Sequence, residues 1–195
     1  MQLLIMVSMI IFLSISSFLA TNVYGVEKIT NIYFSIEIPN NWIYHKSSDS
    51  PTSSLLGIGS SNVIALAPPQ FGNFSVTNNS RDFMQNMQIA GAICIFSQEL
   101  YNSTDNPKLE DYVRIKTLSQ NDLNIISQEE TTVGDERAVR IYADGIGKFA
   151  NFKYIEYLIV HDKKPYYISY TARLAEYYTY LSEFDQVIKS FTFKD

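Results

Sequence analysis

The sequence predicts one α+β domain built on an antiparallel sheet. Segments in which apolar and polar side chains alternate recur along the chain, which is typical of strands with one covered face. Two further segments carry apolar residues at helical spacing. A chain of 195 residues with 46% apolar residues is long enough for one substantial core.

The N-terminal segment reads as a targeting segment rather than as part of this domain. Met1 to Gly25 has no charged side chain, and Leu3 to Ala20 is almost wholly apolar. This pattern is typical of a secretory signal or a membrane anchor. Because no Lys or Arg precedes the apolar segment, a cytoplasmic protein with an unusual N-terminus stays open as a third possibility.

Two fates of the leader are consistent with its sequence. A signal peptidase could cut after Gly25, since Val23 and Gly25 place small residues at the required spacing. Alternatively the segment stays as an anchor, because 18 helical residues nearly span a hydrocarbon core of about 30 Å. We therefore divide the chain into residues 1–25, a signal peptide or anchor, and residues 26–195, one extracytoplasmic domain.

The first predicted strand is Ile32 to Ile38, in which every even position is apolar and Pro39 ends the run. Trp42 to His45 is predicted to form a short return strand. Val63 to Ala67 is a third strand, preceded by a Ser/Gly-rich loop. Ala90 to Phe96 has apolar residues on both faces, which favours a central position in the sheet.

Asn106 and Pro107 mark the start of a helix, as N-cap and first helical residue. Acidic residues follow in its first turns, where they suit the helix dipole. The helix should end near Gln120. One face of it is predicted to carry Leu109, Tyr112, Val113 and Lys116.

The second half of the chain is predicted to be a meander closed by a helix. Strands are expected at Leu123 to Glu129 and at Arg137 to Tyr142, with Asp144-Gly145 ending the second. A long hairpin follows, Tyr154 to Val160 and Tyr166 to Ala172, joined by a loop over residues 161–165. Ser182 to Asp185 resembles a capping box and predicts the start of the last helix, with an inward face formed by Phe184, Val187, Ile188 and Phe191.

Composition excludes some classes of protein. A net charge of −5 argues against a nucleic-acid binder, which needs a basic surface to neutralise phosphates. Cys94 is the single cysteine, so no internal disulfide can form, and its apolar neighbours favour a buried, inert thiol.

The residues do not suggest catalysis. His45 and His161 are the two histidines, and Gly57 to Ser61 lacks the spacing of a nucleophile elbow. We interpret that glycine-rich stretch as a flexible loop. The chain is therefore not expected to be an enzyme, and no catalytic residue is assigned.

A metal site is not assigned, although two places could contribute to one. His161-Asp162 offers a nitrogen and a carboxylate, and Glu129-Glu130 with Asp135-Glu136 could supply oxygens to a weak calcium site. The same residues are better explained as solvated turns. Calcium therefore remains an option, with its ligands unknown.

Fourteen tyrosines suit a protein that recognises other surfaces. Tyr177, Tyr178 and Tyr180 precede the predicted last helix; some should lie in the core and the rest could form a partner surface. Three N-x-S/T sequences could be glycosylated outside the cell or could arise by chance. They begin at Asn73, Asn78 and Asn102.

The order of elements resembles the PsbP-like family over residues 29–194. The resemblance lies in a strand ending in Ile38-Pro39-Asn40-Asn41-Trp42, the pair around Gly134 to Ala138, the hairpin ending at Tyr167 to Ala172, and a closing helix from Phe184 to Phe191. It implies an α-β-α sandwich around a central antiparallel sheet. The namesake is an extrinsic subunit of the oxygen-evolving photosystem, and some members influence calcium or manganese.

The resemblance also sets an expectation of function. It implies a non-enzymatic extracytoplasmic accessory or scaffold protein that docks on a membrane-associated complex, with a protein partner at the outer face of the membrane. The alternative is an envelope binding module for a small ligand or calcium. The short apolar leader, which has no transit-peptide composition, is more similar to prokaryotic and archaeal relatives than to a photosynthetic subunit.

Overall fold

The computed structural model describes residues 25–47, 60–68, 92–98, 108–119, 123–146 and 151–194. Several predictions fall outside this part of the chain. They concern the leader before Gly25, the three N-x-S/T sequences, the Asn106-Pro107 helix start, and the side chains of His45 and Cys94.

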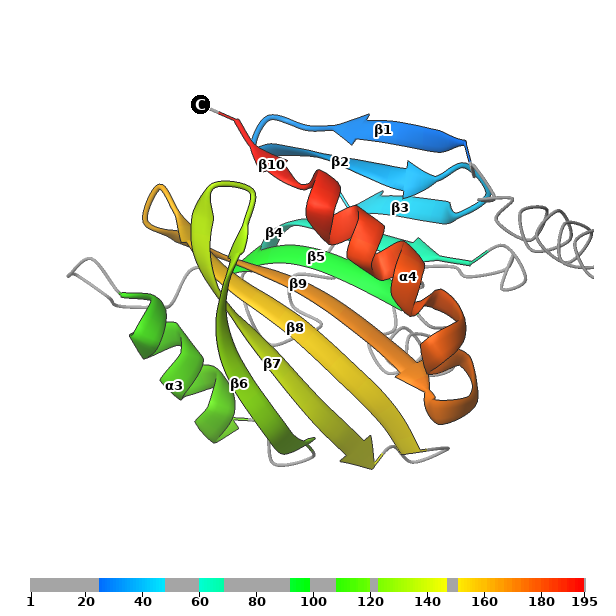
Figure 1. Cartoon of the computed structure of the whole chain (residues 1–195). Coiled ribbons are helices and arrows are strands. Elements are labelled where there is room, and N and C mark those ends of the chain that lie inside the picture. The colour runs from blue at the N-terminus through cyan, green and yellow to red at the C-terminus, as the bar shows by residue number, and fades with distance from the viewer. Residues whose placement is uncertain are drawn as a thin grey trace, which may run out of the picture.

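Seven strands form one antiparallel sheet, and three more form a small second sheet (Figure 1). The large sheet has the order β3-β4-β5-β9-β8-β7-β6 and the small sheet the order β1-β2-β10. The strands of the large sheet, in chain order, are β3 (Ile43–Ser47), β4 (Ser60–Ala67), β5 (Ala92–Gln98), β6 (Leu123–Val133), β7 (Glu136–Ile146), β8 (Asn151–His161) and β9 (Lys164–Arg173). The small sheet consists of β1 (Val26–Thr30), β2 (Phe34–Pro39) and β10 (Thr192–Phe193).

Helices α3 (Leu109–Ser119) and α4 (Leu174–Ser190) cover opposite faces of the large sheet. Successive side chains of a strand point to opposite faces. On β8, Glu156 bonds Lys116 of α3, whereas the next residue, Tyr157, packs on Phe184 of α4. The fold is therefore an α-β-α sandwich around an antiparallel sheet, as the resemblance to the PsbP-like family implies. The single covered face predicted from alternation was wrong for the central strands β8 and β9, which are buried on both sides. Among the described residues, no helix has the length and apolar character needed to cross a bilayer.

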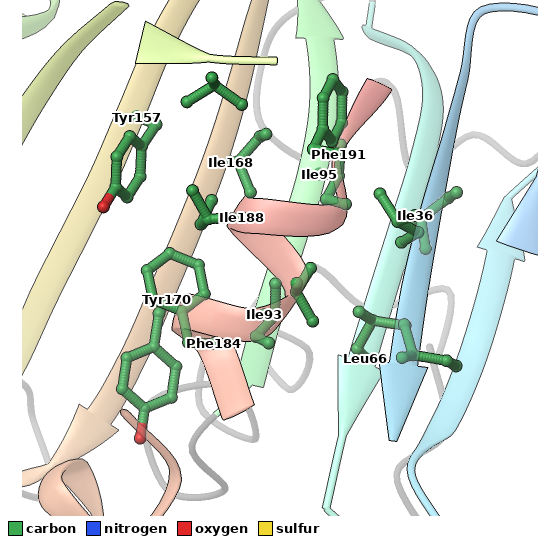
Figure 2. Close-up of a cluster of buried hydrophobic side chains, with 14 of the residues drawn as sticks. Ile36, Leu66, Ile93, Ile95, Tyr157, Ile168, Tyr170, Phe184, Ile188 and Phe191 are labelled. Atoms are coloured by element: carbon green, nitrogen blue, oxygen red, sulfur yellow. The ribbon is translucent and has the colours of Figure 1, made fainter. Parts of the chain in front are cut away.

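The core lies between α4 and the two sheets. Figure 2 shows Phe184 and Ile188 of α4 over the sheet side chains Ile93, Ile168 and Tyr170. The Phe184 and Tyr170 rings stack with their centroids 5.3 Å apart. On the other side of α4, β2 contributes the buried side chains Phe34, Ile36 and Ile38.

The predicted strand at residues 32–38 is confirmed except at its start. Ile32 is 77% exposed, because Asn31 forms a turn before the strand. The Asn31 side-chain oxygen accepts hydrogen bonds from the amides of Tyr33 and Phe34, at 2.8 Å each. This local bonding competes with strand pairing, so β2 begins at Phe34.

Both hairpins of the meander are tighter and longer than predicted. The β8–β9 connection is a two-residue turn in which Asp162 and Lys163 both have positive φ, 48° and 65°. That is the geometry of a type I′ turn, so the five-residue loop predicted at 161–165 was wrong. Gly145 was predicted to end β7, but the strand continues to Ile146. A glycine stands at this position because the Phe152 ring occupies the space of a side chain.

The last helix begins eight residues before the predicted capping box. Ser182 lies in the middle of α4, and its hydroxyl donates to the Glu183 side chain at 2.8 Å instead of capping. Tyr177, Leu181, Phe184 and Ile188 continue one inward face through both halves of the helix. The predicted start at Ser182 was therefore wrong, and the tyrosine segment belongs to the helix.

Candidate docking surfaces

The three tyrosines predicted as a partner surface lie in the first half of α4 in three different environments. Tyr177 is buried and stacks on Tyr170, with ring centroids 5.4 Å apart. Tyr180 is half-buried and meets the edge of Trp42. Tyr178 is 66% exposed and is the one of the three that presents its ring to solvent.

Tyr178 is one of three large apolar residues exposed at one end of the large sheet. Leu174 lies one helical turn before Tyr178 on the same face of α4. Ile146, at the end of β7, is exposed as well. Gly145 of β7 pairs with Phe152 of β8, which in turn pairs with Arg173 of β9. The backbones at the ends of β7 and β9 are therefore separated by two strand spacings, about 10 Å. We call Ile146, Leu174 and Tyr178 the apolar end.

A rigid base supports the apolar end. The Tyr178 ring stands edge-on to the buried Tyr177 ring, at 5.1 Å and 90°. The Tyr170 hydroxyl donates to the Tyr177 carbonyl at 2.9 Å. Burial raises the pKa of Tyr170 and Tyr177 well above the usual value for a phenol, so both hydroxyls are protonated donors at neutral pH.

A groove of about 460 Å³ runs between α3 and the edge of the large sheet at β6. Its helical side is one face of α3 with the spacing i, i+3, i+4, i+7, i+8. The other residues come from β6 and β7. The lining consists of Glu110, Val113, Arg114, Thr117 and Leu118 from α3, Gln128, Glu129 and Glu130 from β6, and Arg137 and Val139 from β7.

Two polar bridges join α3 to the sheet across this groove. At one end, Arg137 bonds Glu110 of α3 at 2.5 Å and Glu130 of β6 at 2.8 Å. At the other, the Gln128 amide donates to Thr117 at 3.2 Å. The pKa of Glu110 is lowered by a hydrogen bond from backbone and by Arg137, so its carboxylate is charged at neutral pH.

A buried ion pair holds α3 on the sheet beside the groove. Glu156 is fully buried, and one of its oxygens accepts a hydrogen bond from Lys116 at 2.9 Å and another from the Tyr154 hydroxyl. The Lys116 ammonium also lies 5.0 Å from the centre of the Tyr167 ring. The second Glu156 oxygen, Oε1, has no hydrogen-bond partner.

Three of the four acidic residues considered for calcium already have side-chain partners. Glu129 bonds Arg140 at 2.5 Å, Glu130 bonds Arg137, and Glu136 lies 2.7 Å from the His161 ring. Among the described residues, no three His, Cys, Asp or Glu side chains come together as a metal site would require.

His161 and Asp162 do not form a shared solvated turn. Asp162 is exposed in the type I′ turn, whereas the His161 ring is largely covered and stacks on Phe193 at 4.1 Å. The tight turn leaves His161 at the end of β8, where it faces β10. The two side chains remain neighbours, with His161 Nε2 3.7 Å from the Asp162 carboxylate, but only Asp162 is solvated.

Sequence reasoning missed the groove and the buried pair. Glu156 interrupts the apolar run of β8, which is the one signal that could have marked it. Arg137 and Glu130 could be placed near one turn, but Glu110 joins them only through the packing of α3.

Comparison with known proteins identifies the fold. No family model and no curated protein matches the sequence. Among solved structures, LpqN, involved in cell envelope biogenesis of Mycobacterium tuberculosis, matches with a TM-score of 0.55 at 11% identity over 93% of this chain and 97% of that chain. The cyanobacterial PsbP (CyanoP) of Synechocystis matches with a TM-score of 0.51 at 14% identity over 90% of this chain and 96% of that one. The chain thus has the PsbP-like fold, which confirms the resemblance.

Proposed function

We propose that this protein is a non-enzymatic accessory or scaffold protein that works outside the cytoplasm and docks on a protein of a membrane-associated assembly. The apolar end of the sheet carries this proposal. Ile146, Leu174 and Tyr178 are all more than half exposed, and they lie at the same end of the large sheet.

The chemistry of the apolar end favours a protein partner. Tyrosine is enriched at protein interfaces because the ring buries a large area while the hydroxyl keeps a polar contact. Residues that dominate binding energy are usually a few aromatic anchors with apolar neighbours. Tyr178 with Leu174 and Ile146 has this composition, and the buried Tyr177 restricts the movement of the exposed ring.

The place of action is supported by the apolar leader and by the known structures. LpqN is described as a protein of cell envelope biogenesis, and PsbP shares the fold. A leader without charges before Glu27 is consistent with export. Together these features favour a partner at the outer face of the membrane.

Co-purification from detergent-solubilised membranes of the source cells tests the proposal. The tagged full chain should enrich a defined set of membrane proteins, and Leu174→Ser with Tyr178→Ser should lower that enrichment at least about tenfold. Ile32→Ser is the matched control, because Ile32 is also an exposed apolar residue but lies in the β1–β2 turn. Equal enrichment by all three proteins would refute docking through the apolar end.

The alternative is an envelope module that binds a small ligand, and the groove beside α3 favours it. Its volume of about 460 Å³ lies in the usual range for ligand sites, roughly 300–1,000 Å³. The calcium version of this alternative has less support, because Glu129 and Glu130 would have to leave their arginine partners and Glu136 its contact with the His161 ring.

A further inference from the structure

The groove between α3 and β6 lies beside a free sheet edge. Among the described strands, β6 is the last in the order of the large sheet, so one side of it has no strand neighbour. It is 11 residues long and pairs with β7 along its other side. In an antiparallel pair, every second residue turns its backbone N–H and C=O away from the partner strand. Those groups form a row along the outer side of β6.

The side chains next to this row belong to the groove. Gln128 and Glu130 lie two residues apart on β6 and line it. Helix α3 runs beside the strand (Figure 1), and its residues Val113 and Leu118 form the opposite wall. A strand added to β6 would therefore direct alternate side chains into the groove and the others away from it.

The groove offers two different places for a side chain: the space between the two bridges and the surroundings of the Arg137 bridge. Between the bridges the lining consists of Val113 and Val139 together with Arg114, whose charge is offset by Asp111 at 3.6 Å. Leu118 adds an exposed apolar side chain. At the Arg137 bridge, two carboxylates share one guanidinium, which leaves one net negative charge. Gln128 and Glu130 are about 7 Å apart along the strand, which is the spacing of two same-face side chains of an added strand.

We propose that this groove binds an extended segment of a partner protein, which adds to β6 as an eighth strand. The segment places an apolar side chain on Val113 and Val139 and, two residues away, a Lys or Arg beside Glu110 and Glu130. Backbone hydrogen bonds to β6 supply much of the affinity, and the two side chains supply the specificity.

Charge decides between this occupant and a second copy of the chain. Two β6 strands paired with each other around Glu130 would bring two Arg137 bridges, each with one surplus negative charge, close together. Like charges on facing strands are destabilising. A basic segment meets the opposite charge instead, so the groove favours a different chain.

The inference is independent of the apolar end. The groove lies on the α3 face of the sheet, whereas Leu174 and Tyr178 belong to α4 on the opposite face. Loss of binding at one surface would leave the other unaffected, so the two proposals can fail separately.

Selection from a displayed library of linear peptides of about eight residues tests the inference, since a strand needs about five or six. The bait is the full chain, purified from its cells. We expect enriched peptides with an apolar residue and a Lys or Arg two positions apart. Synthetic versions should slow hydrogen exchange of amides along β6, which a small-molecule site would not require.

Two exposed substitutions then locate the site. Leu118→Glu should weaken the selected peptides at least about tenfold, whereas Ile32→Glu, the same change at an equally exposed position, should leave their affinity unchanged. Glu130→Lys should reverse the charge preference and enrich acidic peptides instead of basic ones. Melting temperatures close to that of the original protein confirm that both variants fold.

Several results would overturn the inference. These are the absence of an enriched pattern, peptides that bind Leu118→Glu as tightly as the original protein, or a basic preference that survives Glu130→Lys. A dimer in sedimentation that Leu118→Glu dissociates would assign the edge to a second copy of the chain.

Discussion

Lys116→Met should destabilise the protein strongly, although the change is confined to the end of one side chain on α3. Methionine keeps the length and apolar stem of lysine but removes the ammonium that bonds Glu156 at 2.9 Å. The Glu156 carboxylate then stays buried without a cationic partner, although the Tyr154 hydroxyl still donates to it.

The size of the effect follows from burial. Breaking a buried pair by removing one partner typically costs about 3–5 kcal/mol, whereas an exposed pair contributes about 0–1 kcal/mol. Glu156 is fully buried and the Lys116 side chain is 17% exposed, so we expect the lower end of the first range, about 3 kcal/mol. For a domain of this size that corresponds to a fall in melting temperature of roughly 6–12 °C.

Urea unfolding followed by circular dichroism measures this loss. Lys189→Met is the matched control, since Lys189 is an exposed lysine on α4, and it should change the free energy of unfolding by less than about 0.5 kcal/mol. Adding Glu156→Leu to Lys116→Met should restore at least half of the stability, because no buried charge remains. If Lys116→Met and Lys189→Met cost the same, Glu156 is not buried as described.

Three further predictions concern the core, the turn and the acidic residues. Burial raises the pKa of Tyr167 and Tyr170, so the stability that these groups contribute is fully present below about pH 10 and is lost above it, at about 3 kcal/mol per pH unit for the two together. Exposed tyrosines ionise first, so phenolate absorbance should reach its full value for fourteen tyrosines only together with unfolding. Full ionisation with unchanged circular dichroism would contradict this. Gly134→Ala should cost at least about 1 kcal/mol in urea unfolding, because φ is +58° there and a Cβ would lie 3.2 Å from the Phe191 carbonyl oxygen. Millimolar calcium should leave the melting temperature unchanged, whereas a site occupied at 100 times its dissociation constant would add about 2.7 kcal/mol.

The strands with clear two-residue alternation could be predicted because the pattern reports burial directly. On β2, Phe34, Ile36 and Ile38 are buried and Glu37 between them is exposed, as the rule predicts. The hairpin β8–β9 does not alternate, because it is buried on both faces of the sheet. The failure of the rule at Ile32 arises from the side chain of Asn31, which bonds the backbone locally and delays the strand by two residues.

Elements defined by distant partners could not be predicted. The strand β10 has two residues and exists because Thr192 pairs with Ser35, far away in the sequence. Likewise β1 buries a single residue, Ile29, and depends on pairing with β2. Local sequence contains neither contact, so neither strand has a signal of its own.

The start of α4 shows a local signal outweighed by packing. Ser182 to Asp185 has the residue types of a capping box, yet Tyr177 and Tyr170 fix the helix earlier by ring stacking and a hydrogen bond. The helical spacing of Tyr177, Leu181 and Phe184 was the sequence signal for this earlier start of α4.

The candidate surfaces were accessible to sequence reasoning only in part. Tyrosine content pointed to the first half of α4, but only the helical geometry separates the exposed Tyr178 from the buried Tyr177. The groove depends on how α3 packs over β7 and β8 beside β6, an arrangement that no motif encodes.

Site-specific photocrosslinking in living source cells tests the central claim, docking through the apolar end, most directly. A benzophenone amino acid replaces Tyr178 in one variant and Ile32 in another, both exposed positions. We predict that position 178 gives an adduct with one membrane-associated protein and that position 32 does not. The same adducts from both positions, or none from position 178, would contradict the claim.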